Sequence, residues 1–131
     1  MQAIKTQDLT RDFGMSLIII THNLGVVARY ADRVNVMYAG RIVEKGTADD
    51  IYDDPRHPYT VGLMASVPQL DQDVKKKLIP IEGQPPDLSN LPTGCAFHPR
   101  CTYATDRCRE EIPELESVSE THQKACWIDV K

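Results

Sequence analysis

The sequence predicts an α/β fold followed by a loop-rich, cysteine-containing extension. Residues 17–20 form an unbroken apolar run, which is typical of a short strand covered on both faces. Residues 33–45 contain an alternating apolar pattern interrupted by a turn, which predicts a hairpin. All nine prolines lie after Asp54, so we expect the second half to be rich in loops.

Composition excludes several classes of protein. The chain has 131 residues, 41% of them hydrophobic, which fits one domain or a piece of a domain with an appendage. The net charge is -4 and the longest basic block is residues 75–77, so nucleic acid is not an expected partner. No apolar run approaches the roughly 18 residues that a membrane-spanning helix needs. The first residues lack a signal-peptide core, and we expect an intracellular protein.

The run at residues 17–20 is the centre of the predicted fold. Its three isoleucines are β-branched and favour a strand, preceded by a helix over residues 2–13. The run ends at the polar residues 21–23, and apolar residues then recur at helical spacing over residues 24–31. His22 therefore lies at a strand's carboxyl end, where open α/β sheets bind ligands. A surface or capping histidine is the alternative.

Residues 33–38 and 41–45 are predicted to form the two strands of the hairpin, with Gly40 supplying a positive φ in the turn. One face of the first strand is predicted to be buried, and its residues are Val34, Val36 and Tyr38.

Two helices are predicted after the hairpin. Thr47 resembles a helix N-cap with Asp50 three positions on, and that helix should end before Pro55. Pro58 can open the next helix, which Pro68 would stop. Its inward residues are predicted to be Tyr59, Leu63 and Met64. Residues 79–88 then indicate an extended, polyproline-like segment whose apolar side chains pack against the rest of the protein.

Four segments of the sequence match one family closely. Residues 18–27 (IIITHNLGVV) resemble the switch-histidine segment of ABC-transporter ATPase subunits, and residues 31–46 (ADRVNVMYAGRIVEKG) resemble the hairpin that follows it. Residues 55–60 (PRHPYT) and 94–101 (GCAFHPRC) resemble the C-terminal region of the oligopeptide/dipeptide importer branch, which includes nickel importers.

The resemblance implies that this chain is the C-terminal third of such a P-loop ATPase subunit. The phosphate loop G-x-x-x-x-G-K-S/T is absent, as are the signature motif and the acidic magnesium strand, so the fragment alone is not expected to hydrolyse ATP. Residues 1–68 would be the end of the ATPase domain and residues 69–131 the transporter-type extension. A stand-alone iron–sulfur or zinc module and an inactive gene remnant are the alternatives.

By the same resemblance, His22 is the residue that contacts the γ-phosphate of ATP and helps to place the attacking water. The complete subunit would be an ATPase that binds ATP and Mg²⁺, pairs with a second ATP-binding subunit and drives peptide transport through membrane-spanning permease subunits. It would lie on the cytoplasmic side of the membrane. Asn23 departs from the family, which often has aspartate there, and we expect a mild effect.

The four cysteines have the spacing C-x5-C-x6-C-x17-C, and they are Cys95, Cys101, Cys108 and Cys126. Disulfides are disfavoured in an intracellular chain. A zinc site is compatible with the ligand type, although zinc sites usually contain tighter C-x2-C pairs. Four separated thiolates also suit a 4Fe–4S cluster, which some members of the family carry at this pattern. Free buried thiols remain the fourth alternative.

Several neighbours of the cysteines have a predicted role in the site. His98 and His122 are candidate further ligands or, alternatively, ordinary surface histidines. Trp127 is predicted to shield the site, as apolar shells do around metals. The nearby arginines would offset the charge of thiolates or be solvated, and they are Arg100, Arg107 and Arg109.

Overall fold

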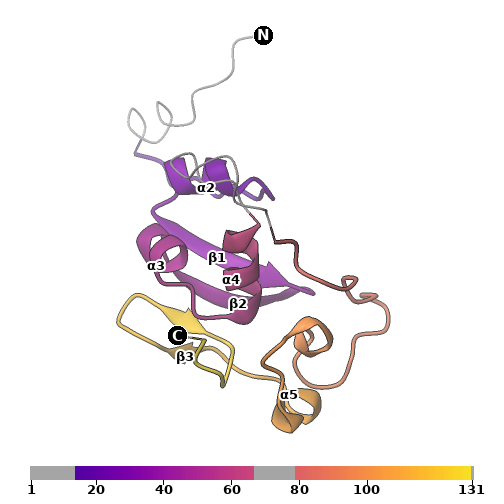
Figure 1. The fold of residues 1–131 in the computed structure, drawn as a ribbon. Coiled ribbons are helices and arrows are strands. Elements are labelled where there is room, and N and C mark those ends of the chain that lie inside the picture. The colour runs from indigo at the N-terminus through magenta and orange to yellow at the C-terminus, as the bar shows by residue number, and fades with distance from the viewer. Residues whose placement is uncertain (1–13, 67–78, 131) are drawn as a thin grey trace. The chain divides into compact units, whose positions relative to one another are not determined.

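A computed structural model describes residues 14–66 and 79–130 of the chain (Figure 1). The chain divides into two compact units, Met1–Ala31 and Asp32–Lys131. The helix predicted over residues 2–13 and the stop at Pro68 lie outside the described residues.

The first unit contains one described helix, α2 (Leu24–Tyr30). Asn23 is its N-cap, since its side-chain oxygen accepts the N–H groups of Gly25 at 3.0 Å and Val26 at 3.2 Å. The predicted change from a polar tip to a helix after residue 23 is therefore confirmed.

The buried strand predicted at residues 17–20 is wrong for this structure. These residues have no regular secondary structure, and Ile18 and Ile20 are 88% and 96% exposed. A strand in the middle of a parallel sheet needs hydrogen-bonding neighbours on both sides. Residues 14–31, the described part of this unit, contain no strand that pairs with it.

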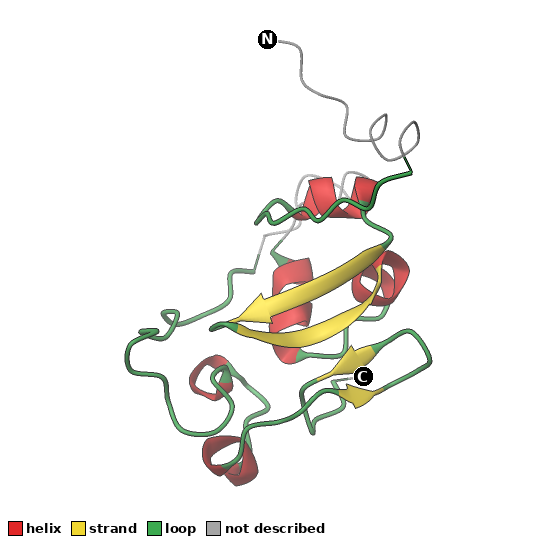
Figure 2. Ribbon diagram, turned by 180° about the vertical axis from the view of Figure 1, so that it is seen from behind, coloured by secondary structure: helices red, strands yellow, loops and turns green. Residues whose placement is uncertain are grey.

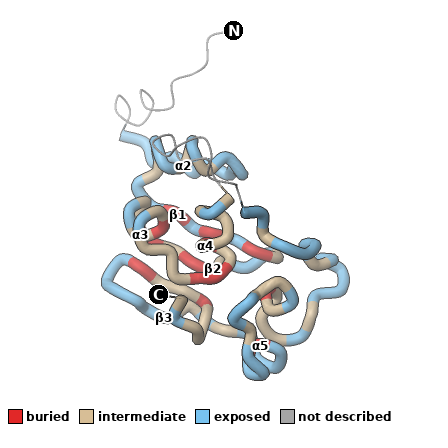
Figure 3. Tube along the Cα trace, in the orientation of Figure 1, coloured by how far each residue is buried: buried red, intermediate tan, exposed pale blue. Residues whose placement is uncertain are grey.

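The second unit is built on the predicted hairpin, which is confirmed (Figure 2). Strand β1 (Arg33–Tyr38) pairs antiparallel with β2 (Arg41–Thr47). The two-residue turn has positive φ at both positions, 49° at Ala39 and 79° at Gly40. Two-residue hairpin turns of the primed type match the twist of the strands but require such angles. The predicted face of β1 is buried, and its residues are Val34, Val36 and Tyr38 (Figure 3).

An irregularity in β2 turns two successive side chains inward. Val36 pairs with Glu44 and Met37 pairs with Ile42, so Val43 is an extra residue between the paired positions. Such a bulge interrupts the alternation of faces along a strand. Val43 and Glu44 are consequently both buried, at 8% and 0% exposure.

Two short helices follow β2. Helix α3 (Ala48–Asp53) begins with the predicted capping box, in which Thr47 Oγ1 accepts the Asp50 N–H at 3.1 Å and Asp50 Oδ2 accepts the Thr47 N–H at 2.9 Å. Helix α4 (Pro58–Ala65) begins at the predicted proline. The prediction of its inward face was only partly right, because Pro58 and Thr60 are the buried residues.

The side chains predicted to face inward from α4 are half-buried, and they are Tyr59, Leu63 and Met64. Tyr59 packs on the hairpin, with its ring centroid 4.7 Å from that of Tyr38. The ring centroid of Phe97 lies 5.1 Å from that of Tyr38 and 5.4 Å from that of Tyr59, so these three residues form an aromatic cluster.

The C-terminal segment extends the sheet. Strand β4 (Gln123–Lys124) pairs with β2, and β3 (Glu116–Ser117) pairs with β4, giving the antiparallel order β1-β2-β4-β3. The domain boundary after residue 68 stays a prediction. The pairing of β2 with β4 places residues from both sides of that boundary in one sheet.

The segment over residues 79–88 has no helix or strand, as predicted. Ile81 packs closely enough on Gly62 that a Cβ added there would lie 2.8 Å from Ile81 Cγ1. Ile79 and Leu88, in contrast, are 67% and 71% exposed, so only one of the three apolar side chains packs as predicted. Among the described residues, no helix is both long enough and apolar enough to cross a membrane.

Gly94 closes the loop that leads into the short helices η1 (His98–Arg100) and α5 (Asp106–Glu110). Its φ is 72°, and an added Cβ would overlap the Cys108 carbonyl oxygen and lie 2.6 Å from the Arg109 carbonyl carbon. Only glycine combines this backbone angle with so close an approach.

We expect Gly94→Ala to destabilise the chain by at least about 2 kcal/mol, because φ strain and backbone overlap add. Gly40→Ala is the matched control, since Gly40 also has positive φ but nothing lies within 4 Å of an added Cβ. That change should cost about 1 kcal/mol. Urea unfolding followed by circular dichroism measures both, and equal losses would contradict the close approach at Gly94.

Candidate functional site

The four cysteines lie on different pieces of the C-terminal segment. Cys95 and Cys101 lie on either side of η1, Cys108 is in α5, and Cys126 follows β4. The Cys95 N–H donates to the Cys108 carbonyl at 2.8 Å, which brings two of these turns together. All four cysteines are free, so none of the disulfide alternatives is present.

Burial and neighbouring cysteines shift the pKa of three of the thiols, Cys95, Cys101 and Cys126. As smaller causes after burial, the electrostatic interaction with Cys108 raises the pKa of Cys95 and Cys101, and the interactions with Cys95 and Cys101 raise the pKa of Cys126. Burial raises the pKa of Cys95 and Cys101, and it raises the pKa of Cys126 to about 11. Each of these three thiols would therefore have to lose a proton to bind a metal.

Hydrogen-bonding groups lie beside each sulfur. Ile128 N–H donates to Cys126 Sγ at 3.4 Å, and Thr105 Oγ1 lies 3.3 Å from Cys108 Sγ. Backbone N–H groups also lower the pKa of two thiols, against the larger effect of burial: Phe97 and His98 act on Cys95, and Tyr103 acts on Cys101. Donors of this kind stabilise the charge of a thiolate.

The metal expectation is not supported by the arrangement of the side chains. The described residues contain no group of three or more His, Cys, Asp or Glu that could hold a metal ion. The donor set fits the chemistry of a thiolate centre, since it offers four thiols with hydrogen-bonding groups beside them. The four thiols thus supply suitable ligand chemistry, but the described side chains do not form a coordination site.

The neighbouring side chains have partners of their own. His122 Nε2 lies 2.6 Å from Glu44 Oε1, and His98 Nδ1 lies 2.9 Å from the Cys95 carbonyl oxygen. Trp127 is half-buried and stacks under the Arg107 guanidinium at 4.3 Å. Arg109 pairs with Asp106 at 2.7 Å.

The sequence analysis missed a buried carboxylate. Glu44 Oε1 accepts the Arg56 N–H at 2.6 Å and faces His122 Nε2, while Oε2 accepts the His57 N–H at 2.9 Å. A carboxylate can only accept hydrogen bonds, so His122 donates in this contact. Three donors from two distant parts of the chain therefore meet at one side chain. The only sequence signal was a charged residue in a strand, which normally indicates a solvent-facing position.

His57 caps helix α4 from a buried position. Its Nδ1 accepts the Tyr59 N–H at 3.1 Å, which leaves the hydrogen of the neutral ring on Nε2. Nε2 has no hydrogen-bond partner. Burial, with a smaller contribution from the charge of Lys124, lowers the pKa of His57 from 6.5 to about 4. The ring is thus held neutral.

The switch-histidine segment lies in the first unit. His22 is exposed in the loop before α2, and the Thr21 hydroxyl accepts the Asn23 N–H at 3.0 Å. The role of His22 stays a prediction.

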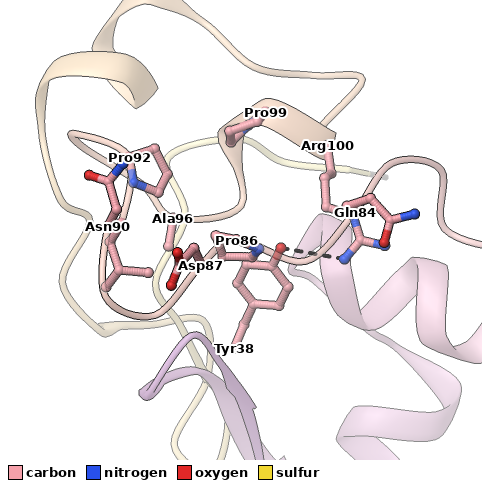
Figure 4. A pocket seen from close by; sticks show the side chains of 10 residues that line it. Tyr38, Gln84, Pro86, Asp87, Asn90, Pro92, Ala96, Pro99 and Arg100 are labelled. Atoms are coloured by element: carbon pink, nitrogen blue, oxygen red, sulfur yellow. Dashed lines mark hydrogen bonds between the residues drawn. The ribbon is translucent and has the colours of Figure 1, made fainter.

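Two cavities adjoin the aromatic cluster of the second unit. The first has a volume of about 360 Å³, and Tyr38 and Arg100 line it together with Asp87 and Asn90 (Figure 4). Arg100 fixes one wall, since its guanidinium donates to the Glu82 carbonyl at 2.9 Å as well as to the Tyr38 hydroxyl at 3.4 Å. The second, of about 320 Å³, is largely apolar and includes Cys95 in its lining.

Comparison with known proteins agrees with the four matched segments. Residues 43–108 match the family model described as oligopeptide/dipeptide transporter, C-terminal region. Oligopeptide transport ATP-binding protein OppD of Bacillus subtilis is 52% identical over 122 residues, which are 93% of this chain and 34% of that protein. The proteins of the same name from Mycobacterium tuberculosis and Haemophilus influenzae are 52% and 45% identical, over 86% and 95% of this chain and 18% and 38% of theirs.

The described residues of the second unit thus form a small α/β module with an antiparallel sheet. The chain belongs to the oligopeptide/dipeptide transporter C-terminal region family. It spans well under half the length of the relatives it matches.

The low pKa of His57 predicts a loss of stability in acid. A histidine whose pKa is lower in the folded chain than in the unfolded chain stabilises the fold above pH 6.5 and loses that contribution as the pH falls towards 4. The loss is about 3 kcal/mol. His57→Asn keeps an N-cap acceptor but does not titrate, so its stability should fall less over this range. Urea unfolding at several pH values measures the difference, and parallel curves for both proteins would contradict the assignment.

Proposed function

We propose that the chain is the C-terminal portion of the ATP-binding subunit of an ABC importer for peptides or nickel. The match of residues 43–108 to the transporter family is the observation that carries this proposal. The relatives' names refer to oligopeptide transport and ATP binding, and this supports the same role for the complete protein to which the chain corresponds. The comparisons do not favour the stand-alone module or the gene remnant.

The complete subunit would hydrolyse ATP with Mg²⁺, pair with a second ATP-binding subunit and act on permease subunits at the cytoplasmic face of the membrane. This chain lacks a phosphate loop, so the fragment alone is not proposed to be catalytic. Residues 17–20 would gain their parallel neighbours from the remainder of the subunit. Their apolar side chains, exposed in this structure, support that inference.

His22 is the proposed residue at the γ-phosphate of ATP. Phosphoryl transfer depends mostly on positioning and on stabilisation of charge, and an imidazole can donate from one ring nitrogen while accepting at the other. The cap formed by Asn23 supports this role, because it fixes the start of α2 immediately after the histidine.

In the complete subunit, His22→Ala should lower ATP turnover by about 100-fold or more, the effect of losing one preorganised contact, while ATP binding persists. Asn23→Asp is the control, because aspartate is an equally good N-cap and should leave turnover near that of the parent. Steady-state hydrolysis and nucleotide titration separate the two effects. Near-normal turnover in His22→Ala would make this histidine a structural residue.

The finer proposal concerns Cys95, Cys101, Cys108 and Cys126, which we infer to hold one inorganic centre, a 4Fe–4S cluster or alternatively zinc. Such a centre would act as a structural staple. In the described part of residues 79–130 the buried apolar side chains are Phe97, Cys108 and Ala125, which is little surface against the entropy of ordering the segment. A metal bound by thiolates contributes about 10 kcal/mol in structural zinc sites.

Protein purified without oxygen should be brown, and each single Cys→Ser change should remove the colour and loosen the segment. Glu120→Gln is the control, because Glu120 is exposed and its substitution leaves all four thiols in place. Visible absorbance and elemental analysis of iron, sulfide and zinc give the result. Colourless protein with one zinc per chain would select the zinc alternative. Metal-free protein with an ordered segment would reject both.

A further inference from the structure

Glu44 makes hydrogen bonds to two parts of the chain, and each of these parts leads to some of the cysteines. Its side chain has no exposed surface, and it lies inside because the bulge at Val43 turns it away from solvent. A buried carboxylate is tolerated only where donors surround it. Those donors come from the loop before α4 and from the turn before β4, so the position of Glu44 fixes both.

The first connection leads to Cys95 and Cys101. Glu44 Oε2 accepts the main-chain N–H of His57, and the His57 ring lies 5.9 Å from the ring of Phe97. Phe97 is 4% exposed and lies in sequence between these two cysteines. The hydrogen bond from the Cys95 N–H to the Cys108 carbonyl links Cys108, the third cysteine, to this group.

The second connection leads to Cys126. His122 is 2% exposed and donates to Glu44, and β4 begins at the next residue. Ala125 N–H then donates to the Val43 carbonyl at 2.8 Å, which anchors the residue immediately before Cys126 beside the bulge. Glu44 and Val43 thus hold β4 in place, and Cys126, the fourth cysteine, follows this strand.

We propose that Glu44 is a positioning residue for the four-cysteine site, which brings Cys126 to the other three thiols by binding His57 on one side and His122 on the other. This inference rests on the proposed shared cysteine centre. It assigns to the hairpin a part in building that centre, although the hairpin contributes no ligand.

Glutamine cannot replace Glu44 in this role. Each carboxylate oxygen accepts a main-chain N–H, one from Arg56 and one from His57. Whichever way a glutamine amide is turned, its NH₂ group faces one of these donors, and a buried N–H is left without an acceptor. Glu44→Gln is therefore a test that changes the hydrogen-bond pattern while keeping the size of the side chain.

The experiment uses the complete metal-free chain and a reagent that alkylates two neighbouring thiols, followed by peptide mapping. In the parent, cross-links should join Cys126 to Cys95 or Cys101. In Glu44→Gln the yield of cross-links to Cys126 should fall about tenfold, because a thiol that is no longer held loses effective concentration. Cross-links among Cys95, Cys101 and Cys108 should persist, which a general unfolding would not allow.

His122→Phe removes only the second connection and should reproduce the selective loss. Glu120→Gln is the matched control, since Glu120 is exposed in the same turn, and its cross-links should equal those of the parent. Unchanged cross-links to Cys126 in Glu44→Gln would overturn the proposal. Loss of every cross-link in both Glu44→Gln and His122→Phe would also overturn it, because Glu44 would then support the whole fold.

The cross-link pattern separates this inference from the proposed centre. If the parent binds neither iron nor zinc but shows cross-links to Cys126 that Glu44→Gln loses, the inorganic centre is rejected and the positioning role of Glu44 is upheld. If the parent binds metal and the cross-links do not depend on Glu44, the centre is upheld and the positioning role is rejected.

Discussion

The burial of the Glu44 carboxylate is the constraint that joins the loop before α4 to the turn before β4. A charged group in an apolar interior is costly unless donors surround it, and removing one partner of such a group typically costs about 3–5 kcal/mol. Here the donors are two successive main-chain N–H groups and one imidazole, 78 residues from Glu44. One side chain therefore helps to place both the loop before α4 and the turn before β4.

Features that depend on neighbouring residues could be predicted from the sequence. The Ala39–Gly40 turn, the capping box of Thr47 and Asp50, and the start of α4 at Pro58 all follow from patterns a few residues long. Each of these patterns meets the conformational or hydrogen-bonding needs of its own backbone. Their geometry therefore depends little on the rest of the chain.

Features that depend on distant partners could not be predicted. Residues 17–20 have the composition of a buried strand, but a strand forms only where another strand supplies hydrogen bonds. Glu44 would face solvent in a regular strand, and only the register shift at Val43 reveals that it faces inward. The cysteine spacing likewise showed that four thiols are available, whereas the arrangement of the segments that carry them depends on Gly94, on Phe97 and on the pairing of β4 with β2.

The distance along the chain between Glu44 and His122 has a consequence for synthesis on the ribosome. The hairpin and its capping box are complete once about residue 50 has emerged, and a hairpin forms within about 1–10 μs. At about 5–20 residues per second, several seconds pass before the imidazole that completes the carboxylate's environment is made. During that interval the Glu44 carboxylate stays hydrated, and its contact with the turn before β4 can form only after His122 has emerged.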